Sequence, residues 1–178
     1  MAEEPKEKWL NYLALTTVIL AVCATLSTFK GAGYSTRAVL SQTQAANQWA
    51  YYQAKSIKSY LYEIQKEALE LGYKKDKTKT TRVLADEYEK KIELYARKLK
   101  KYDEEKAVIS KEAKTLESVR DDAQKHAQIF GMAVIFLQIA ILLSSIAALM
   151  KKKPVWVIGM SAGVVGLIYF VNGFLLFF

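Results

Sequence analysis

The sequence predicts an all-α membrane protein with three transmembrane helices and a long antiparallel coiled-coil hairpin between the first two. Three observations lead to this prediction. Three long segments contain no charged residue, a highly charged segment separates the first two of them, and apolar residues recur every three or four positions within that charged segment. The 178 residues include only two prolines, which suits long unbroken helices.

The three uncharged segments are Leu10–Phe29, Ile129–Met150 and Val155–Phe178. Each reaches the roughly 20 residues that a helix needs to cross a bilayer, so we expect transmembrane helices at 9–29, 129–150 and 155–178. The first segment has some features of a secretion signal, but Val22 is bulky where processing requires a small residue. We therefore expect a retained anchor.

The short loop 151–154, with three consecutive lysines, predicts the orientation in the membrane. Lysine-rich short loops stay in the cytoplasm, so residues 1–8 are also expected there and 30–128 in the periplasm. The middle segment opposes this orientation because it is itself positively charged. It carries 21 of the 26 basic residues but only 15 of the 18 acidic ones. Long segments translocate largely regardless of charge, which favours the loop, and a cytoplasmic hairpin is the alternative.

Two stripes at alternating steps of three and four residues predict the arms of the hairpin. The stripe in the second arm is interrupted only by Lys106 and Arg120, whose charged ends are expected to reach water while their stems pack. Its members are Ala85, Tyr88, Ile92, Tyr95, Leu99, Tyr102, Lys106, Ile109, Ala113, Leu116, Arg120, Ala123 and Ala127. The stripe in the first arm has no polar member and comprises Ala50, Ala54, Ile57, Leu61, Ile64, Ala68 and Leu71.

Both stripes are long enough to be coiled-coil seams, so each helix is expected to pack on a partner helix. The simplest partner is the other arm of the same hairpin. Gly72 is expected to end the first arm and Thr80 or Thr81 to cap the second, which places the tip at 73–80. Gly31 and Gly33 are expected to interrupt the first arm. The segment from Ala85 to Met150 is expected to form one continuous helix.

The tract Asn47–Ser56, rich in amide and aromatic residues, follows a first span that opens with Lys8-Trp9-Leu10-Asn11. In these features, and in its order of one span, a charged helical region and two closing spans, the chain resembles the bacterial membrane-protein family catalogued as domain of unknown function 4337. The resemblance implies a bacterial inner-membrane protein. It supplies no activity, so no catalytic residue follows from it.

The same tract supplies the candidate interface residues. Its tryptophan, tyrosines and amides would serve either as contacts between the two arms or as a subunit or partner interface, where Trp and Tyr are enriched. The candidates are Asn47, Gln48, Trp49, Tyr51, Tyr52, Gln53 and Lys55.

Small and polar residues in the spans are candidates for helix packing. They would act within one chain or between protomers, and both hypotheses stay open. The candidates are Gly159, Gly163, Gly166, Gln138, Ser144, Ser145 and Asn172. The spans contain no Asp, Glu, Lys, Arg or His at depth, which argues against a proton- or sodium-coupled transporter.

The predicted tip is strongly basic. It would meet an anionic envelope surface or an acidic protein, or it would be a solvated turn. No nucleic-acid partner is expected, because one tyrosine offers little stacking surface. The basic residues are Lys74, Lys75, Lys77, Lys79 and Arg82.

No catalytic, cofactor-binding or metal-binding residue is predicted. Cys23 and His126 are the only cysteine and histidine, and no phosphate-binding loop or nucleophile motif occurs. The exposed carboxylates are mostly followed by lysines at three or four residues, as on ordinary helix surfaces. His126 with Asp121 and Asp122 would bind a cation or sense pH, but a water-facing histidine is the simpler expectation.

The preferred hypothesis is a non-enzymatic, homo-oligomeric inner-membrane scaffold whose partners are membrane lipid and copies of itself. One alternative is an oligomeric passive channel with Gln138, Ser144, Ser145 or Asn172 along its lumen. Another is an accessory subunit of a larger membrane complex.

Overall fold

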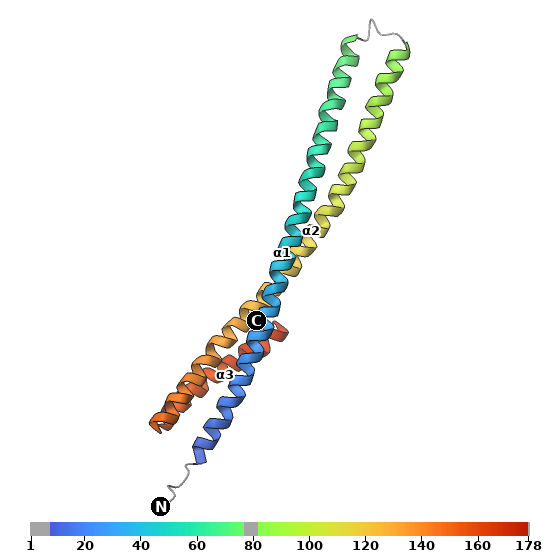
Figure 1. Cartoon of the computed structure of the whole chain (residues 1–178). Coiled ribbons are helices and arrows are strands. Elements are labelled where there is room, and N and C mark those ends of the chain that lie inside the picture. Colours follow the sequence, from blue (N-terminus) through green and yellow to red (C-terminus); the bar gives the residue numbers. More distant parts are fainter. Residues whose placement is uncertain (1–7, 77–81, 178) are drawn as a thin grey trace, which may run out of the picture. The chain divides into compact units, whose positions relative to one another are not determined.

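The computed structural model describes residues 8–76 and 82–177. In these ranges the chain forms three α-helices and no strand: α1 (Lys8–Asp76), α2 (Arg82–Met150) and α3 (Lys153–Leu175) (Figure 1). Each helix contains a window long and apolar enough to cross a membrane. The predicted all-α class is therefore confirmed, and three helices are long and apolar enough to cross a membrane.

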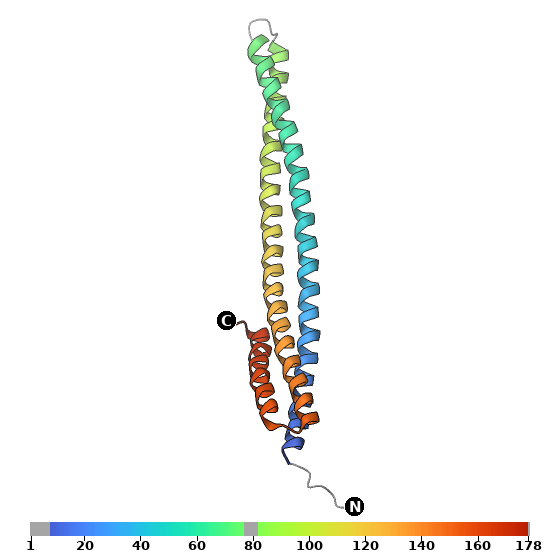
Figure 2. The ribbon, with the colours of Figure 1, turned by 90° about the vertical axis from the view of Figure 1, so that its left-hand side faces the viewer.

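The helices are distributed over two compact units. The three-helix unit comprises residues 1–40 and 119–178, and the two-helix unit comprises residues 41–118. In the two-helix unit, α1 and α2 lie side by side in both views and run in opposite directions (Figures 1 and 2).

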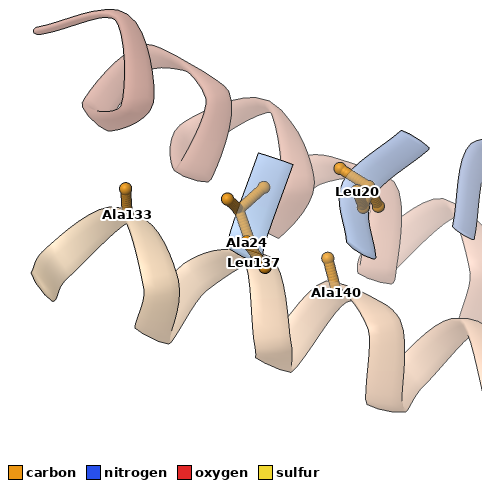
Figure 3. Packing of buried hydrophobic residues seen from close by; sticks show 5 residues of the cluster. All are labelled: Leu20, Ala24, Ala133, Leu137 and Ala140. Carbon is orange, nitrogen blue, oxygen red and sulfur yellow. The ribbon is translucent and has the colours of Figure 1, made fainter. Parts of the chain in front are cut away.

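The core of the three-helix unit consists mainly of small and aliphatic side chains. Leu20 and Ala24 of α1 pack with Ala133, Leu137 and Ala140 of α2, and Figure 3 shows this cluster beside α3. Small residues allow the helix backbones to approach closely, which increases the van der Waals contact between them.

The link between α2 and α3 is only two residues long. Lys151 has a left-handed backbone with φ of 50°, and the Lys152 amide donates to the Ala147 carbonyl at 3.2 Å. Pro154 then sits in the first turn of α3, where its missing N–H costs no helical bond. Such a short link makes α2 and α3 antiparallel neighbours.

The expected interruption of the first arm at Gly31 and Gly33 is wrong, because α1 continues through both. Gly31 has a packing role, since a Cβ there would lie 3.2 Å from the Cβ of Phe130. Gly72 also does not end its helix, since α1 extends to Asp76 and Gly72 lies beside the ring of Tyr88. One glycine costs a helix only about 1 kcal/mol relative to alanine, so packing can outweigh it.

The expectation that the segment from Ala85 to Met150 is one helix is confirmed, because α2 runs unbroken from Arg82 to Met150. Residues 77–81, which include half of the predicted tip and both candidate caps Thr80 and Thr81, lie outside the described residues, as do residues 1–7 and Phe178.

Candidate interaction surface

The predicted stripe of α2 is the face that this helix buries. Every member from Ala85 to Ala127 is buried or half-buried, and Ala113 has no exposed surface. Lys106 keeps a fifth of its side-chain surface and pairs with Asp103 at 2.8 Å, which agrees with a stem that packs and a charged end that reaches water.

Polar contacts fix the pairing of α1 with α2 in the two-helix unit. The Trp49 indole N–H donates to Glu117 Oε1 at 2.9 Å, Lys55 Nζ lies 2.6 Å from Glu105 Oε2, and Lys98 Nζ donates to the Tyr62 hydroxyl at 3.0 Å. Nearest to the end of α1, the Tyr73 hydroxyl donates to Glu89 at 3.1 Å. Residues later in α1 thus contact residues earlier in α2, so the two segments are antiparallel.

The face that α1 turns toward α2 is polar and aromatic. Its members are buried or half-buried and recur at alternating steps of four and three residues: Ser41, Ala45, Gln48, Tyr52, Lys55, Ser59, Tyr62, Lys66, Leu69 and Tyr73. Only two of these ten residues are aliphatic. Sequence reasoning missed this face, although the same spacing that identified the α2 stripe would have found it.

The apolar stripe of α1 lies on the opposite side and is exposed at all seven positions from Ala50 to Leu71. Ile57 is 61 % exposed and Ile64 62 %. The expectation that the other arm of the same chain covers this stripe is therefore wrong. We call these seven residues the outer stripe.

The side chains of α2 explain why α1 presents its polar face. The rings of Tyr95 and Tyr102 lie 5.4 and 5.8 Å from the ring of Tyr62, and the Lys55 ammonium lies 5.4 Å from the ring of Tyr102. An aliphatic face there would leave half-buried hydroxyl and carboxylate groups without partners, and each such unpaired group costs about 1 to 3 kcal/mol.

The Lys55–Glu105 pair is an ion pair between the two helices. Its hydrogen bond to Lys55 lowers the pKa of the Glu105 carboxyl, and the same bond raises the pKa of the Lys55 ammonium. Lys55 also lies 5.3 Å from the ring of Tyr51, so a ring and a carboxylate both stabilise its charge.

The candidate interface tract is divided between the two faces of α1. Gln48, Trp49, Tyr52 and Lys55 are half-buried toward α2, where the rings of Trp49 and Tyr52 pack edge to face at 5.6 Å. The remaining three candidates are exposed: Asn47, Tyr51 and Gln53. The larger part of the tract thus makes contacts between the two helices of one chain.

Of the basic tip, Lys74, Lys75 and Arg82 are exposed, whereas Lys77 and Lys79 lie outside the described residues.

The candidate packing residues of the spans separate into a buried and an exposed set. Gly159, Gly163 and Gly166 are buried inside the three-helix unit, where a Cβ on Gly166 would lie 2.9 Å from the backbone nitrogen of Leu137. Ser144 and Asn172 are also fully buried. The two remaining candidates, Gln138 and Ser145, are exposed.

His126 is enclosed rather than water-facing. Its ring stacks on Tyr34 at 4.3 Å, its Nδ1 lies 2.7 Å from the Gly173 carbonyl oxygen, and 13 % of its side chain is exposed. Asp122 lies 3.9 Å from Nε2, while Asp121 pairs with Arg120. Sequence reasoning missed Tyr34 and Gly173, because no local pattern joins residues so far apart in the chain. No three His, Cys, Asp or Glu side chains cluster as a metal site in residues 8–76 and 82–177.

These features define a class of protein: an all-helical chain with three helices suited to cross a membrane and an uncovered apolar helix face outside those windows. Residues 9–176 match the family model described as Domain of unknown function (DUF4337), and the chain belongs to this family, as its sequence features predict. No curated protein and no solved structure matches the chain.

Proposed function

We propose that this protein is a non-enzymatic, membrane-anchored scaffold that assembles with copies of itself. In this proposal the two-helix unit is an antiparallel coiled-coil hairpin, and the outer stripe of one copy packs on the outer stripe of another. The observation that carries the proposal is the exposure of all seven stripe residues, Ala50 to Leu71, on the side of α1 that faces away from α2.

The outer stripe has the spacing of a coiled-coil seam. Its seven residues follow steps of four and three over three heptads, with Ile57, Leu61 and Ile64 at the centre. A contiguous exposed apolar strip of this length is unusual on a protein surface in water and typically marks an interaction site. Burying one such aliphatic side chain contributes about 1.5 to 3 kcal/mol.

A second copy is the partner that the stripe fits best. An apolar seam with regular spacing is complementary to itself, and a two-fold axis places the same residues of two copies in contact. The flanks support this pairing because they carry few charges to repel their counterparts. The exposed flanking residues are Tyr51, Gln53, Lys58, Tyr60, Gln65 and Glu67.

Copies held in one membrane favour a parallel seam. Both chains would enter the bilayer through the same span of α1, so their first arms would leave it in the same direction. Ile57 would then lie opposite Ile57 of the second copy.

We place the protein in a bacterial inner membrane, with residues 1–8 and 151–154 in the cytoplasm and residues 30–128 in the periplasm. The lysines of the short loop support this orientation. An alkaline phosphatase fusion after Asp76 tests it. Phosphatase activity supports a periplasmic hairpin, and an inactive but stable fusion reverses the topology.

The channel alternative has less support. Ser144 and Asn172, two of the four residues proposed for its lumen, are fully buried inside the three-helix unit and are unavailable to an axis between copies. The accessory-subunit alternative covers the same stripe with a different protein, and it is distinguished by the composition of the purified complex.

The mass of the full-length protein in mild detergent tests self-association. We expect an oligomer for the wild type and a monomer for the triple variant Ile57→Gln, Leu61→Gln, Ile64→Gln, because glutamine keeps helix propensity but removes the apolar seam. The matched control replaces three exposed aliphatic residues of α2, Val83→Gln, Leu94→Gln and Val108→Gln, and should stay oligomeric. A monomeric wild type, or equal dissociation of both variants, would refute the proposal.

A further inference from the structure

A hollow lined by four lysines lies where α1 begins and where α2 joins α3. It has a volume of about 650 Å³. Its lining residues are Lys8, Trp9, Lys151, Lys152, Lys153 and Pro154. Two segments distant in the sequence thus bring their basic residues to one place, and the hollow falls within the volume range of ordinary ligand sites.

The backbone adds to the positive potential of these lysines. Lys152 is the N-cap residue of α3 and makes no side-chain capping bond, and the first turns of α1 and α3 contain no acidic residue. The N-terminal amides of a helix carry partial positive charge and bind anions readily. The start of α3 therefore presents a positive end, with no carboxylate in its first turn to compensate it.

Two tryptophans lie beside the lysines. The rings of Trp9 and Trp156 are 6.2 Å apart, and Trp156 Nε1 is buried without a hydrogen-bond partner among the described residues. Tryptophan concentrates at the boundary between lipid tails and headgroups, where its ring is buried and its N–H finds polar partners. This pair therefore suits the level of lipid headgroups.

We propose that this hollow binds the phosphate group of an anionic phospholipid. Ammonium groups and free helix amides are the donors that a phosphate requires, and basic pockets at the ends of transmembrane helices are typical headgroup sites. The inference rests on the membrane insertion proposed above. The lipid site is independent of self-association, because the outer stripe can join two copies without a bound lipid.

Quenching of tryptophan fluorescence by brominated lipid tests this site. The full-length protein would carry Trp49→Phe, which leaves Trp9 and Trp156 as its only indoles. It would be reconstituted into vesicles in which either phosphatidylglycerol or phosphatidylcholine carries the bromine. We expect the apparent affinity for phosphatidylglycerol to exceed that for phosphatidylcholine by about three- to tenfold, since each lysine near an anionic surface adds to binding.

The triple variant Lys8→Gln, Lys152→Gln, Lys153→Gln should reduce this preference to about onefold. Its matched control removes the same charge from three exposed lysines of the two-helix unit, by Lys90→Gln, Lys91→Gln and Lys100→Gln, and should keep the preference. Circular dichroism verifies that both variants retain their helices.

Equal quenching by the two lipids in the parent protein, or the same loss in both variants, would overturn the lipid site while leaving membrane insertion intact. Quenching by neither lipid would overturn membrane insertion as well. Millimolar inorganic phosphate should not relieve the quenching by phosphatidylglycerol. Relief would identify a soluble phosphate as the ligand and overturn the assignment to a lipid.

Discussion

Ile57 and Ser59 lie two residues apart on α1 and face opposite sides of the helix: Ile57 is 61 % exposed and Ser59 is 6 % exposed. The smaller, polar residue is buried on the side of α2, while the larger, apolar residue remains mostly exposed. The same division holds along the helix from Ala50 to Tyr73. Within residues 8–76 and 82–177, α1 is therefore covered on its polar face and exposed on its apolar face.

The Trp49–Glu117 bond is expected to stabilise the two-helix unit. Replacing the acceptor by Glu117→Ala leaves the half-buried indole N–H without its acceptor, which should cost about 1 to 2 kcal/mol. The control Glu112→Ala removes an exposed carboxylate from the same helix and should cost little. Chemical denaturation followed by circular dichroism measures both, and equal stabilities of the two variants would contradict this role.

Acid should weaken the pairing of the two helices through Glu105. Because Lys55 lowers the pKa of Glu105 in the folded state, the stabilisation is complete above the ordinary glutamate pKa of about 4.3 and is lost as the pH falls through the lowered value. The raised pKa of Lys55 acts only at high pH, so it does not change over this acid range.

The melting temperature measured from pH 6 to pH 3 tests this. Glu105→Gln should show a smaller decrease than the wild type, and Glu104→Gln, which alters an exposed neighbour, should follow the wild type. An unchanged acid dependence in Glu105→Gln would show that other carboxylates govern it.

Gly166→Ala should destabilise the three-helix unit by about 1 to 3 kcal/mol, because the added methyl group would lie 2.8 Å from Leu137 Cγ and 2.9 Å from the Leu137 backbone nitrogen. Gly33→Ala is the matched control. No atom lies within 4 Å of its added methyl group, so helix propensity should stabilise it by up to about 1 kcal/mol. Opposite shifts in melting temperature are expected, and a neutral Gly166→Ala would contradict this close approach.

The uncharged segments and the α2 stripe were predictable because each depends on one local property. A run of about 20 residues without a charge predicts a buried or membrane-spanning helix. The stripe that begins at Ala85 repeats with the period of an α-helix. The close approach of α2 and α3 also follows from the short link at Lys151 and Lys152.

The face that α1 presents to α2 was not predictable from hydrophobicity alone. The outer stripe is the more apolar of its two faces, so a search for apolar spacing selects it first. The side chains of α2 decide which face of α1 packs against them. The rings of Tyr95 and Tyr102 pack with the ring of Tyr62. The carboxylate of Glu105 pairs with the ammonium group of Lys55. The stacking of Tyr34 on His126 likewise depends on how separate helices meet.

Cysteine cross-linking in native membranes tests the central claim, that the outer stripe joins two copies, most directly. In a Cys23→Ser background, oxidation should link Ile57→Cys into a disulfide dimer, because a parallel seam places the two cysteines opposite each other, and small movements then reach the roughly 3.5 to 4.5 Å between Cβ atoms that a disulfide needs. Ser59→Cys, which faces α2, should stay monomeric. Equal cross-linking at both positions, or none at Ile57→Cys, would contradict the account.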